Sequence, residues 1–176
     1  MKFFLILLAL MISFAGAQLM PNAKPVPTYM ADSLGKPLLM DFSIKLEGIK
    51  DPNLPFAIFD KRPLMLLYFS PFCPHCQRNY GGIQQIANDY KNAGLESIAV
   101  SVGNVSKKDV LMFIEQQEGT MPFFKDSDFK FGKVYGDGYV PRLYLISPDG
   151  KVVRYTDLES DHIKDIRADI EKLLGK

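Results

Sequence analysis

The stretch of sequence that decides the fold is LMLLYFSPFCPHCQRNYGGIQQIANDYK, residues 64–91. Its first part, residues 64–69, is a continuous apolar run of the kind that forms a central strand buried on both faces. Pro71 ends this run, and from Pro74 the apolar residues recur with the period of a helix. The sequence therefore predicts a buried strand, a short turn that holds the tetrapeptide CPHC at 73–76, and a long helix.

Strand and helix patterns continue on both sides of this stretch. Further strands are predicted at residues 38–46, 56–59, 95–102, 122–124, 142–146 and 151–155. Further helices are predicted at residues 106–117, 126–134 and 160–174, and Ser106 with Asp109 resembles a capping box. Parallel crossovers come first, and an antiparallel hairpin and a helix come last. This order predicts the α/β class, with a central mixed sheet flanked by helices.

The overall composition is that of a globular protein. The chain has 176 residues, of which 47% are hydrophobic and 23% charged, and this length suits one domain with a short extra segment. The formal net charge of +1 gives no reason to expect nucleic acid as a partner.

The N-terminus resembles a secretory signal. Lys2 precedes an almost wholly apolar run at 3–14, and the small residues 15–17 (AGA) follow it, so residues 1–17 are predicted to be cleaved before Gln18. An uncleaved membrane anchor is the alternative, although the run is short for a span of about 20 residues. The proline-rich residues 18–37 are predicted to form a linker, and residues 38–176 the domain. The expected location is periplasmic or otherwise extracytoplasmic.

Both cysteines of the chain, Cys73 and Cys76, lie in the CPHC tetrapeptide. A secreted protein held together by disulfides would have more cysteines, spread along the chain, so a chemical role explains this pair better. Cys73 would start a helix, where free N–H groups and the helix dipole favour the nucleophilic thiolate. Cys76 would then attack the Cys73 sulfur and resolve a mixed disulfide.

The two residues between the cysteines support this interpretation. Pro74 suits the first helical turn because it has no N–H to lose. His75 can add positive character near Cys73, although a solvated loop histidine is the alternative. Zinc needs about four ligands, and the chain has two cysteines and two histidines, with His162 far along the sequence. No metal is therefore predicted, and thiol exchange requires no cofactor.

Residues 38–174 resemble the thioredoxin superfamily and, within it, the exported TlpA/ResA-like branch. The landmarks are the strand at 64–69 that runs into FCPHC, the strand GLESIAVSV at 94–102, and YVPRLYLISPDGKVV at 139–153. The resemblance implies a thioredoxin-like fold with an N-terminal strand extension. It also implies an exported thiol–disulfide oxidoreductase, expected as a monomer. Its implied partners are thiol- or disulfide-containing exported proteins and a membrane electron donor or acceptor.

The resemblance also implies roles for particular residues. Pro141, preceded by Val140, holds the place of a cis-proline that faces the redox cysteines. Phe72 stands where the family usually has tryptophan, and Leu67 stands where it often has a polar residue that assists proton transfer. Candidates for that proton transfer are Glu115, Glu118 and Asp137. The Pro-His dipeptide resembles that of DsbA-type oxidants, whereas the scaffold resembles ResA-like reductants, so both directions of electron flow stay open.

Three other functions remain to be weighed. Copper chaperones related to the Sco type share this fold, but they use a C-x-x-x-C spacing. A peroxiredoxin-type peroxidase needs a cysteine preceded by Thr or Ser and by Pro, and residues 67–76 do not supply that arrangement. A redox-inactive binding module would have no need of both cysteines and the Val140-Pro141 pair. The client and the electron donor do not follow from the sequence.

Overall fold

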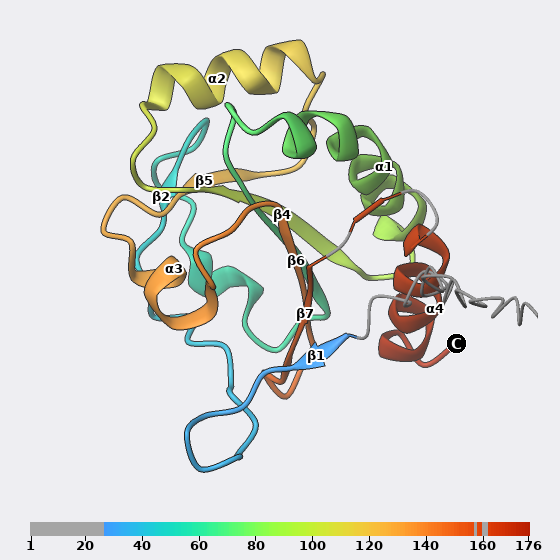
Figure 1. Ribbon diagram of the computed structural model, residues 1–176. Helices are drawn as coiled ribbons and strands as arrows, with labels where there is room; N and C mark the ends of the chain where they lie inside the picture. The colour runs from blue at the N-terminus through green and yellow to red at the C-terminus, as the bar shows by residue number, and fades with distance from the viewer. Residues whose placement is uncertain (1–26, 157, 160–161) are drawn as a thin grey trace, which may run out of the picture.

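The computed structural model describes residues 27–156, 158–159 and 162–176, and it has one central sheet with helices on both faces (Figure 1). The predicted secretory signal, residues 1–17, lies outside these residues, as does most of the predicted linker. The described strands are β1 (Thr28–Tyr29), β2 (Glu47–Gly48), β3 (Leu64–Phe69), β4 (Glu96–Ser101), β5 (Phe123–Lys125), β6 (Arg142–Ile146) and β7 (Val152–Tyr155). The helices are the 3-10 helix η1 (Phe56–Phe59), α1 (Pro74–Lys91), α2 (Lys107–Gln116), α3 (Lys130–Tyr135) and α4 (Ile163–Leu173).

The sheet is mixed, and β3 lies at its centre. The strand order is β1-β7-β6-β3-β4-β5-β2, with β3 parallel to β4 and antiparallel to β6. Every residue of β3 is buried, as the apolar run at 64–69 predicts. The predicted α/β class with a mixed sheet is therefore confirmed.

Alternate residues of β3 face two separate cores. Met65, Leu67 and Phe69 pack in a cluster with residues of α1, α2 and α4. Leu64, Leu66 and Tyr68 face the opposite way and pack in a second cluster with residues of α3 and η1. Burial of each large apolar side chain contributes about 1.5–3 kcal/mol, so β3 stabilises both layers at once.

The helices follow the predicted apolar faces. Tyr80, Ile83 and Ile86 of α1 are fully buried. The capping box of α2 is present, because Ser106 Oγ accepts from the Asp109 amide at 3.1 Å and Asp109 Oδ2 accepts from the Ser106 amide at 3.0 Å. Helix α3 starts at Lys130, four residues later than predicted. Within the described ranges, every helix is too short or too polar to cross a bilayer.

Two predicted strands upstream of β3 are wrong. Residues 38–46 do not form a strand: Leu39 makes an isolated bridge to Lys151, and a turn at Asp41 and Ser43 follows. Residues 56–59 form the helix η1 instead of an edge strand. The N-terminal strand is β1, which pairs with β7 and lies within the segment predicted as linker.

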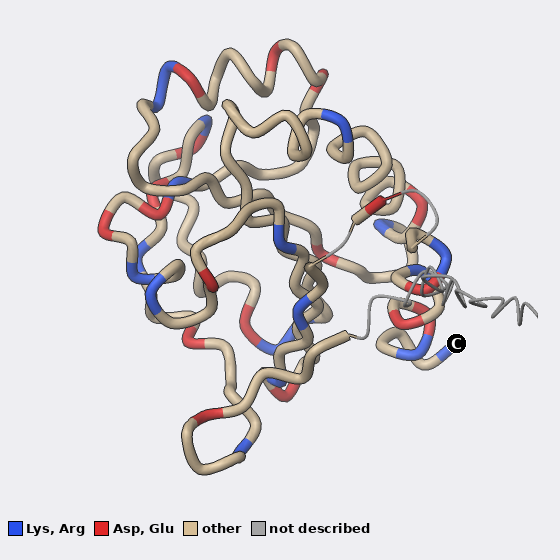
Figure 2. Tube along the Cα trace, viewed as in Figure 1, with Lys and Arg blue, Asp and Glu red and all other residues tan. Residues whose placement is uncertain are grey.

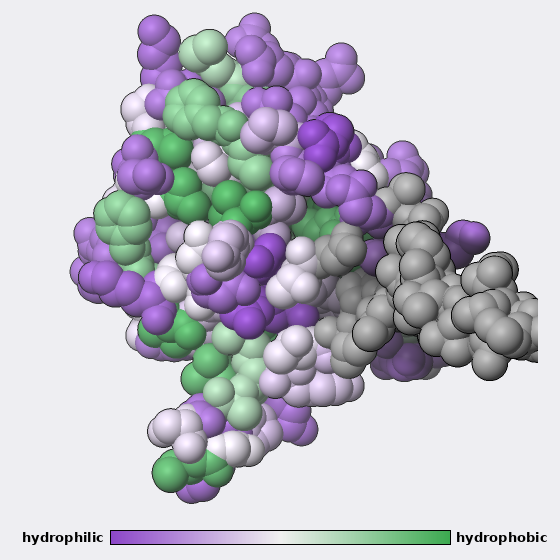
Figure 3. All heavy atoms as spheres, in the orientation of Figure 1, coloured by the Kyte–Doolittle hydropathy of each residue, from purple (hydrophilic) through white to green (hydrophobic). Residues whose placement is uncertain are grey.

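Charge is spread over the molecule. Figure 2 shows Lys and Arg interspersed with Asp and Glu over the coloured part of the trace, which fits the net charge of +1. Apolar side chains gather on one face between α2 and α3 (Figure 3). The CPHC turn joins β3 to α1, so the fold places it at the carboxyl end of the central strand.

Candidate active site

Cys73 is the N-cap residue of α1, and Pro74 is the first residue of that helix. The turn that leads to it from β3 is fixed by two hydrogen bonds. The Cys73 amide donates to the Ser70 carbonyl at 3.1 Å, and Gln77 Nε2 donates to the Pro71 carbonyl at 2.7 Å. The first turn of α1 thus holds the preceding loop, and Cys73 lies where the sequence predicts it.

The two cysteines have different surroundings. Both are free thiols, Cys73 is partly exposed, and Cys76 is 2% exposed. The Cys76 amide donates to Cys73 Sγ at 3.4 Å, so one of the free N–H groups at the start of α1 points at this sulfur. Burial is the main cause that raises the pKa of the Cys76 thiol well above its usual range. Leu67 packs in the same apolar cluster as Cys76 and offers it no polar partner.

The loop before β6 faces Cys73. The Val140–Pro141 peptide bond is cis, in agreement with the prediction for this pair. Cys73 Sγ donates to the Val140 carbonyl oxygen at 3.6 Å, which brings the two segments together. Pro141 is buried and Val140 is half-buried.

His75 and Phe72 lie on the surface of the CPHC turn. The His75 side chain is 62% exposed, and its Nδ1 lies 2.8 Å from Arg78 Nη2 and 3.7 Å from Glu159 Oε1. Phe72 is 65% exposed and Tyr139 is 70% exposed, so two aromatic rings are available to a partner at this site. In the part of the chain that the structure describes, no group of three or more His, Cys, Asp or Glu side chains could hold a metal ion.

An open groove of about 530 Å³ begins beside the CPHC turn. Ser70 and Val140, which flank Cys73, line its near end, and Phe129 and Tyr139 add apolar surface along it. Sequence reasoning did not predict this groove, because Phe129 and Tyr139 come together only when α3 packs on the sheet.

The three proton-transfer candidates lie in different places. Glu115 and Glu118 are exposed near the end of α2. The Asp137 carboxylate lies between two arginines, 3.1 Å from Arg142 Nε and 3.7 Å from Arg154 Nη2. Burial raises the pKa of Asp137, but hydrogen bonding to Arg142 and the positive charges nearby lower it more, and the net pKa lies below its usual value. Such a carboxylate is a weak base, so its role lies elsewhere.

Comparison with solved structures identifies the fold. A secreted disulfide oxidoreductase of Mycobacterium tuberculosis, homologous to E. coli DsbE, matches with a TM-score of 0.63 and 14% identity. The match covers 73% of this chain and 96% of that one. The fold is therefore thioredoxin-like, as the sequence resemblance implies.

The sequence comparisons identify the family. The model of the AhpC/TSA family matches residues 38–155, and the chain belongs to that family. The thiol–disulfide oxidoreductase ResA of Oceanobacillus iheyensis is 25% identical over 114 residues, which are 64% of this chain and 59% of the relative. ResA of Bacillus subtilis is 26% identical over 109 residues, which are 62% of this chain and 60% of the relative. The chain thus spans about 60% of the length of these curated relatives.

Proposed function

We propose that this protein exchanges dithiols and disulfides with exported proteins, with Cys73 as the nucleophile and Cys76 as the resolving thiol. The observation that carries the proposal is the difference between two thiols in one helical turn. Cys73 is accessible and accepts an N–H from the start of α1, whereas Cys76 is buried behind it. Exposure of one sulfur and burial of its neighbour suit a two-step exchange.

The proposed reaction consists of two successive thiol–disulfide exchange steps. The Cys73 thiolate attacks a disulfide of the client, forms a mixed disulfide, and displaces one client thiolate. Cys76 then loses its proton and attacks Cys73 Sγ, so that the Cys73–Cys76 disulfide forms and the second client thiolate leaves. Two electrons pass to the client, whose two thiolates take up two protons, one released when Cys73 forms its thiolate and one released by Cys76. The reverse sequence oxidises a client dithiol.

The location and the partners belong to the same proposal. The signal-like residues 1–17 support export, and an oxidising compartment outside the cytoplasm is where disulfide exchange is in demand. A membrane electron donor or acceptor would return the pair to its working redox state. The ResA relatives are named thiol–disulfide oxidoreductases, which supports the reaction class.

The test traps the mixed disulfide. A Cys76→Ser variant keeps the nucleophile and lacks the resolving thiol, so it should stay covalently attached to a disulfide-containing model peptide. The linkage should break on addition of dithiothreitol. A Cys73→Ser variant is the matched control and should trap nothing. Equal trapping by both variants, or by neither, would contradict the proposed roles.

Peroxide reduction is tested in parallel, because the chain belongs to the AhpC/TSA family. We expect the reduced protein to consume hydrogen peroxide no faster than a short CPHC peptide does, since residues 67–76 lack the peroxidase arrangement. Rapid consumption that depends on Cys73 would favour a peroxidase over the exchange reaction.

A further inference from the structure

The loop that carries Val140 to Cys73 contains two glycines that the backbone requires. Gly138 has a φ of +84°, a conformation that L side chains rarely adopt. A Cβ at Gly136 would lie 2.5 Å from the Gly132 carbonyl oxygen. Because glycine leaves a chain free to adopt many conformations, a loop with glycines on both sides of Asp137 needs an anchor to hold one position.

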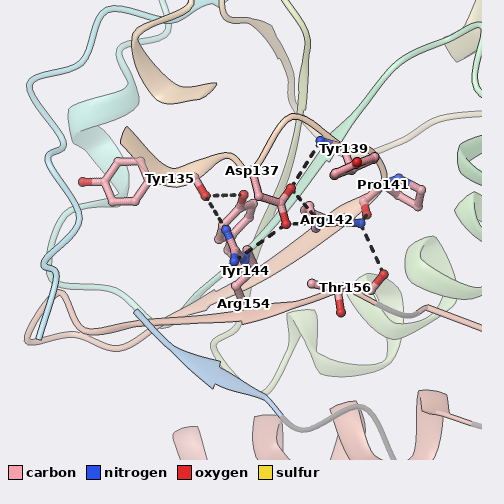
Figure 4. Close-up of polar contacts among 8 residues, drawn as sticks. All are labelled: Tyr135, Asp137, Tyr139, Pro141, Arg142, Tyr144, Arg154 and Thr156. Carbon is pink, nitrogen blue, oxygen red and sulfur yellow. Dashed lines mark hydrogen bonds and ion pairs between the residues drawn. The ribbon is translucent and has the colours of Figure 1, made fainter. Parts of the chain in front are cut away.

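Asp137 supplies that anchor through two arginines (Figure 4). Arg142 Nε lies 3.1 Å from both carboxylate oxygens, and Arg154 Nη2 lies 3.7 Å from Oδ2. The side chains are only 12% (Arg142), 18% (Arg154) and 27% (Asp137) exposed. Partly buried charges are screened by salt much less than surface pairs, so this network is stronger than an ordinary surface ion pair.

The same two arginines also donate hydrogen bonds to three backbone carbonyl groups around the loop (Figure 4). Arg142 Nη1 donates to the Pro141 carbonyl at 2.8 Å and to the Thr156 carbonyl, beyond β7, at 3.3 Å. Arg154 Nη1 donates to the Tyr135 carbonyl, at the end of α3, at 3.3 Å. These hydrogen bonds connect the loop to the end of α3 and to the residue that follows β7.

Tyr139, which lies between Gly138 and Val140, is part of the network too. The Tyr139 amide donates to Asp137 Oδ1 at 3.3 Å, and the Arg142 guanidinium lies 5.6 Å from the centre of the Tyr139 ring. A cation over an aromatic ring is attracted to the negative face of the ring. Tyr139 is thus held next to Val140, whose carbonyl contacts Cys73.

We propose that Asp137, Arg142 and Arg154 are positioning residues that hold the Val140 backbone beside Cys73, with Tyr139 next to it in the same loop, so that a polypeptide client can pair with this loop during disulfide exchange. This inference rests on the proposed function. An extended client that adds to exposed backbone gains affinity from main-chain hydrogen bonds, and those require the loop to be in place before the client arrives.

Arginine is required at 142 because one planar group binds several partners there. Nε faces the Asp137 carboxylate while Nη1 donates to two carbonyls. Lysine keeps the charge but has a single nitrogen, so it cannot reproduce this arrangement. Arg142→Lys therefore separates loss of geometry from loss of charge.

The experiment compares two reactions of Cys73 in the same set of variants. One is exchange with a disulfide-containing model peptide, which would use the loop, and the other is alkylation by iodoacetamide, which needs only an accessible thiolate. The variants are Asp137→Asn and Arg142→Lys. The matched control is Asp89→Asn, which removes an Asp–Arg pair of 2.6 Å to Arg167, about 24 Å along α1 from Cys73.

We expect kcat/KM for the peptide to fall at least about tenfold in both variants, since a misplacement of about 1 Å near reacting atoms costs up to about a hundredfold. Alkylation should change less than about twofold, because thiolate access is unaltered. The Asp89→Asn control should leave both rates unchanged. If Asp137→Asn does not fold, Arg142→Lys carries the test.

Two outcomes would overturn the inference. One is unchanged peptide exchange in the variants, and the other is an equal fall in peptide exchange and alkylation, which indicates general damage. Failure of the wild-type protein itself to exchange with the peptide would contradict the proposed function, whereas a defect confined to the variants concerns the loop.

Discussion

At the scale of single residues, the two thiols are predicted to react at very different rates. Burial keeps Cys76 protonated, whereas Cys73 is accessible at the start of α1. We expect iodoacetamide to label Cys73 first when the reduced protein is treated at mildly acidic to neutral pH. Mass spectrometry of proteolytic fragments locates the label. Preferential labelling of Cys76 would reverse the assignment of nucleophile and resolving thiol.

Asp137 gives a second prediction at this scale, through pH. Its pKa in the folded protein is below the usual value of 3.8, so its stabilising effect is fully present above that pH and is lost as the pH falls through the folded pKa. At pH 7, Asp137→Asn should lower the free energy of unfolding by about 1.5–3 kcal/mol, the range of a hydrogen bond to a charged group.

The difference between wild type and Asp137→Asn should shrink toward zero as the pH falls through the folded pKa of Asp137, because both side chains are neutral below it. Urea unfolding of both proteins between pH 7 and pH 2.5 measures it. A difference that stays constant over this range would show that the carboxylate charge does not stabilise the loop.

Sequence reasoning found the cysteines and the Val140–Pro141 pair but gave Asp137 a different role. It listed Asp137 as a proton-transfer candidate because nothing local reveals its two arginines. The signal was available in the predicted hairpin, whose register pairs Tyr144 with Arg154 and so puts Arg142 and Arg154 on one face. The carboxylate between them depends on the path of the loop, which depends on glycines and tertiary packing.

At the scale of elements, the start of α1 leads to a prediction of the reduction potential. The Cys76 amide donates to Cys73 Sγ at 3.4 Å, and a hydrogen bond from a helix start stabilises the negative charge that develops in the reduced pair during exchange. A more stable reduced form makes the disulfide a better oxidant, so we expect a potential less negative than thioredoxin's value of about −270 mV. Equilibration against glutathione buffers, read by thiol trapping, measures it.

His75 tests which feature of the helix start matters. Its Nδ1 lies 2.8 Å from Arg78 Nη2 and 3.7 Å from Glu159 Oε1, whereas the Cys73 sulfur accepts from the Cys76 amide. If the amide dominates, His75→Gln should change the potential by less than about 30 mV, which corresponds to about 1.4 kcal/mol. A wild-type potential at or below that of thioredoxin would contradict the prediction and favour a reductive role like that of the scaffold's relatives.

The two wrongly predicted elements show where periodicity misleads. Residues 38–46 do bury alternate side chains, among them Met40, Ile44 and Leu46. However, an Asp41–Ser43 turn, in which the Ser43 amide donates to Asp41 Oδ1 at 2.9 Å, breaks the ladder, so the segment covers one core without joining the sheet. In η1, Phe56 and Phe59 are buried while Ile58 is exposed, a spacing of three that fits a 3-10 turn better than a strand.

At the scale of the whole molecule, the fold was predictable because one strand organises it. An all-apolar run such as β3 is stable only between two covered faces, and this requires helices on both sides of a sheet. The edges of the sheet were not predictable. Strands β1 and β2 have two residues each, and their pairing depends on contacts with β7 and β5 rather than on local pattern.

The stability of the whole molecule should depend on the redox state of the CPHC pair. Folding and reduction form a closed thermodynamic cycle. The reduced protein must therefore be more stable than the oxidised one by about 1.4 kcal/mol for each 30 mV by which the folded site exceeds the potential of the unfolded dithiol. A disulfide between residues 73 and 76 stabilises the oxidised protein little through the unfolded state, because it closes a short loop.

We therefore expect the reduced form to unfold at the higher Tm, with a separation of about 2–4 °C for each kcal/mol in a protein of this size. Calorimetry of the two forms measures it, and a Cys73→Ser/Cys76→Ser double variant should show the same Tm with and without reductant. Since the contact from the Cys76 amide to Cys73 Sγ exists only in the folded protein, its contribution should appear in this difference. A higher Tm for the oxidised form would mean that the folded site has a more negative potential than the unfolded dithiol, so that folding does not favour the reduced pair.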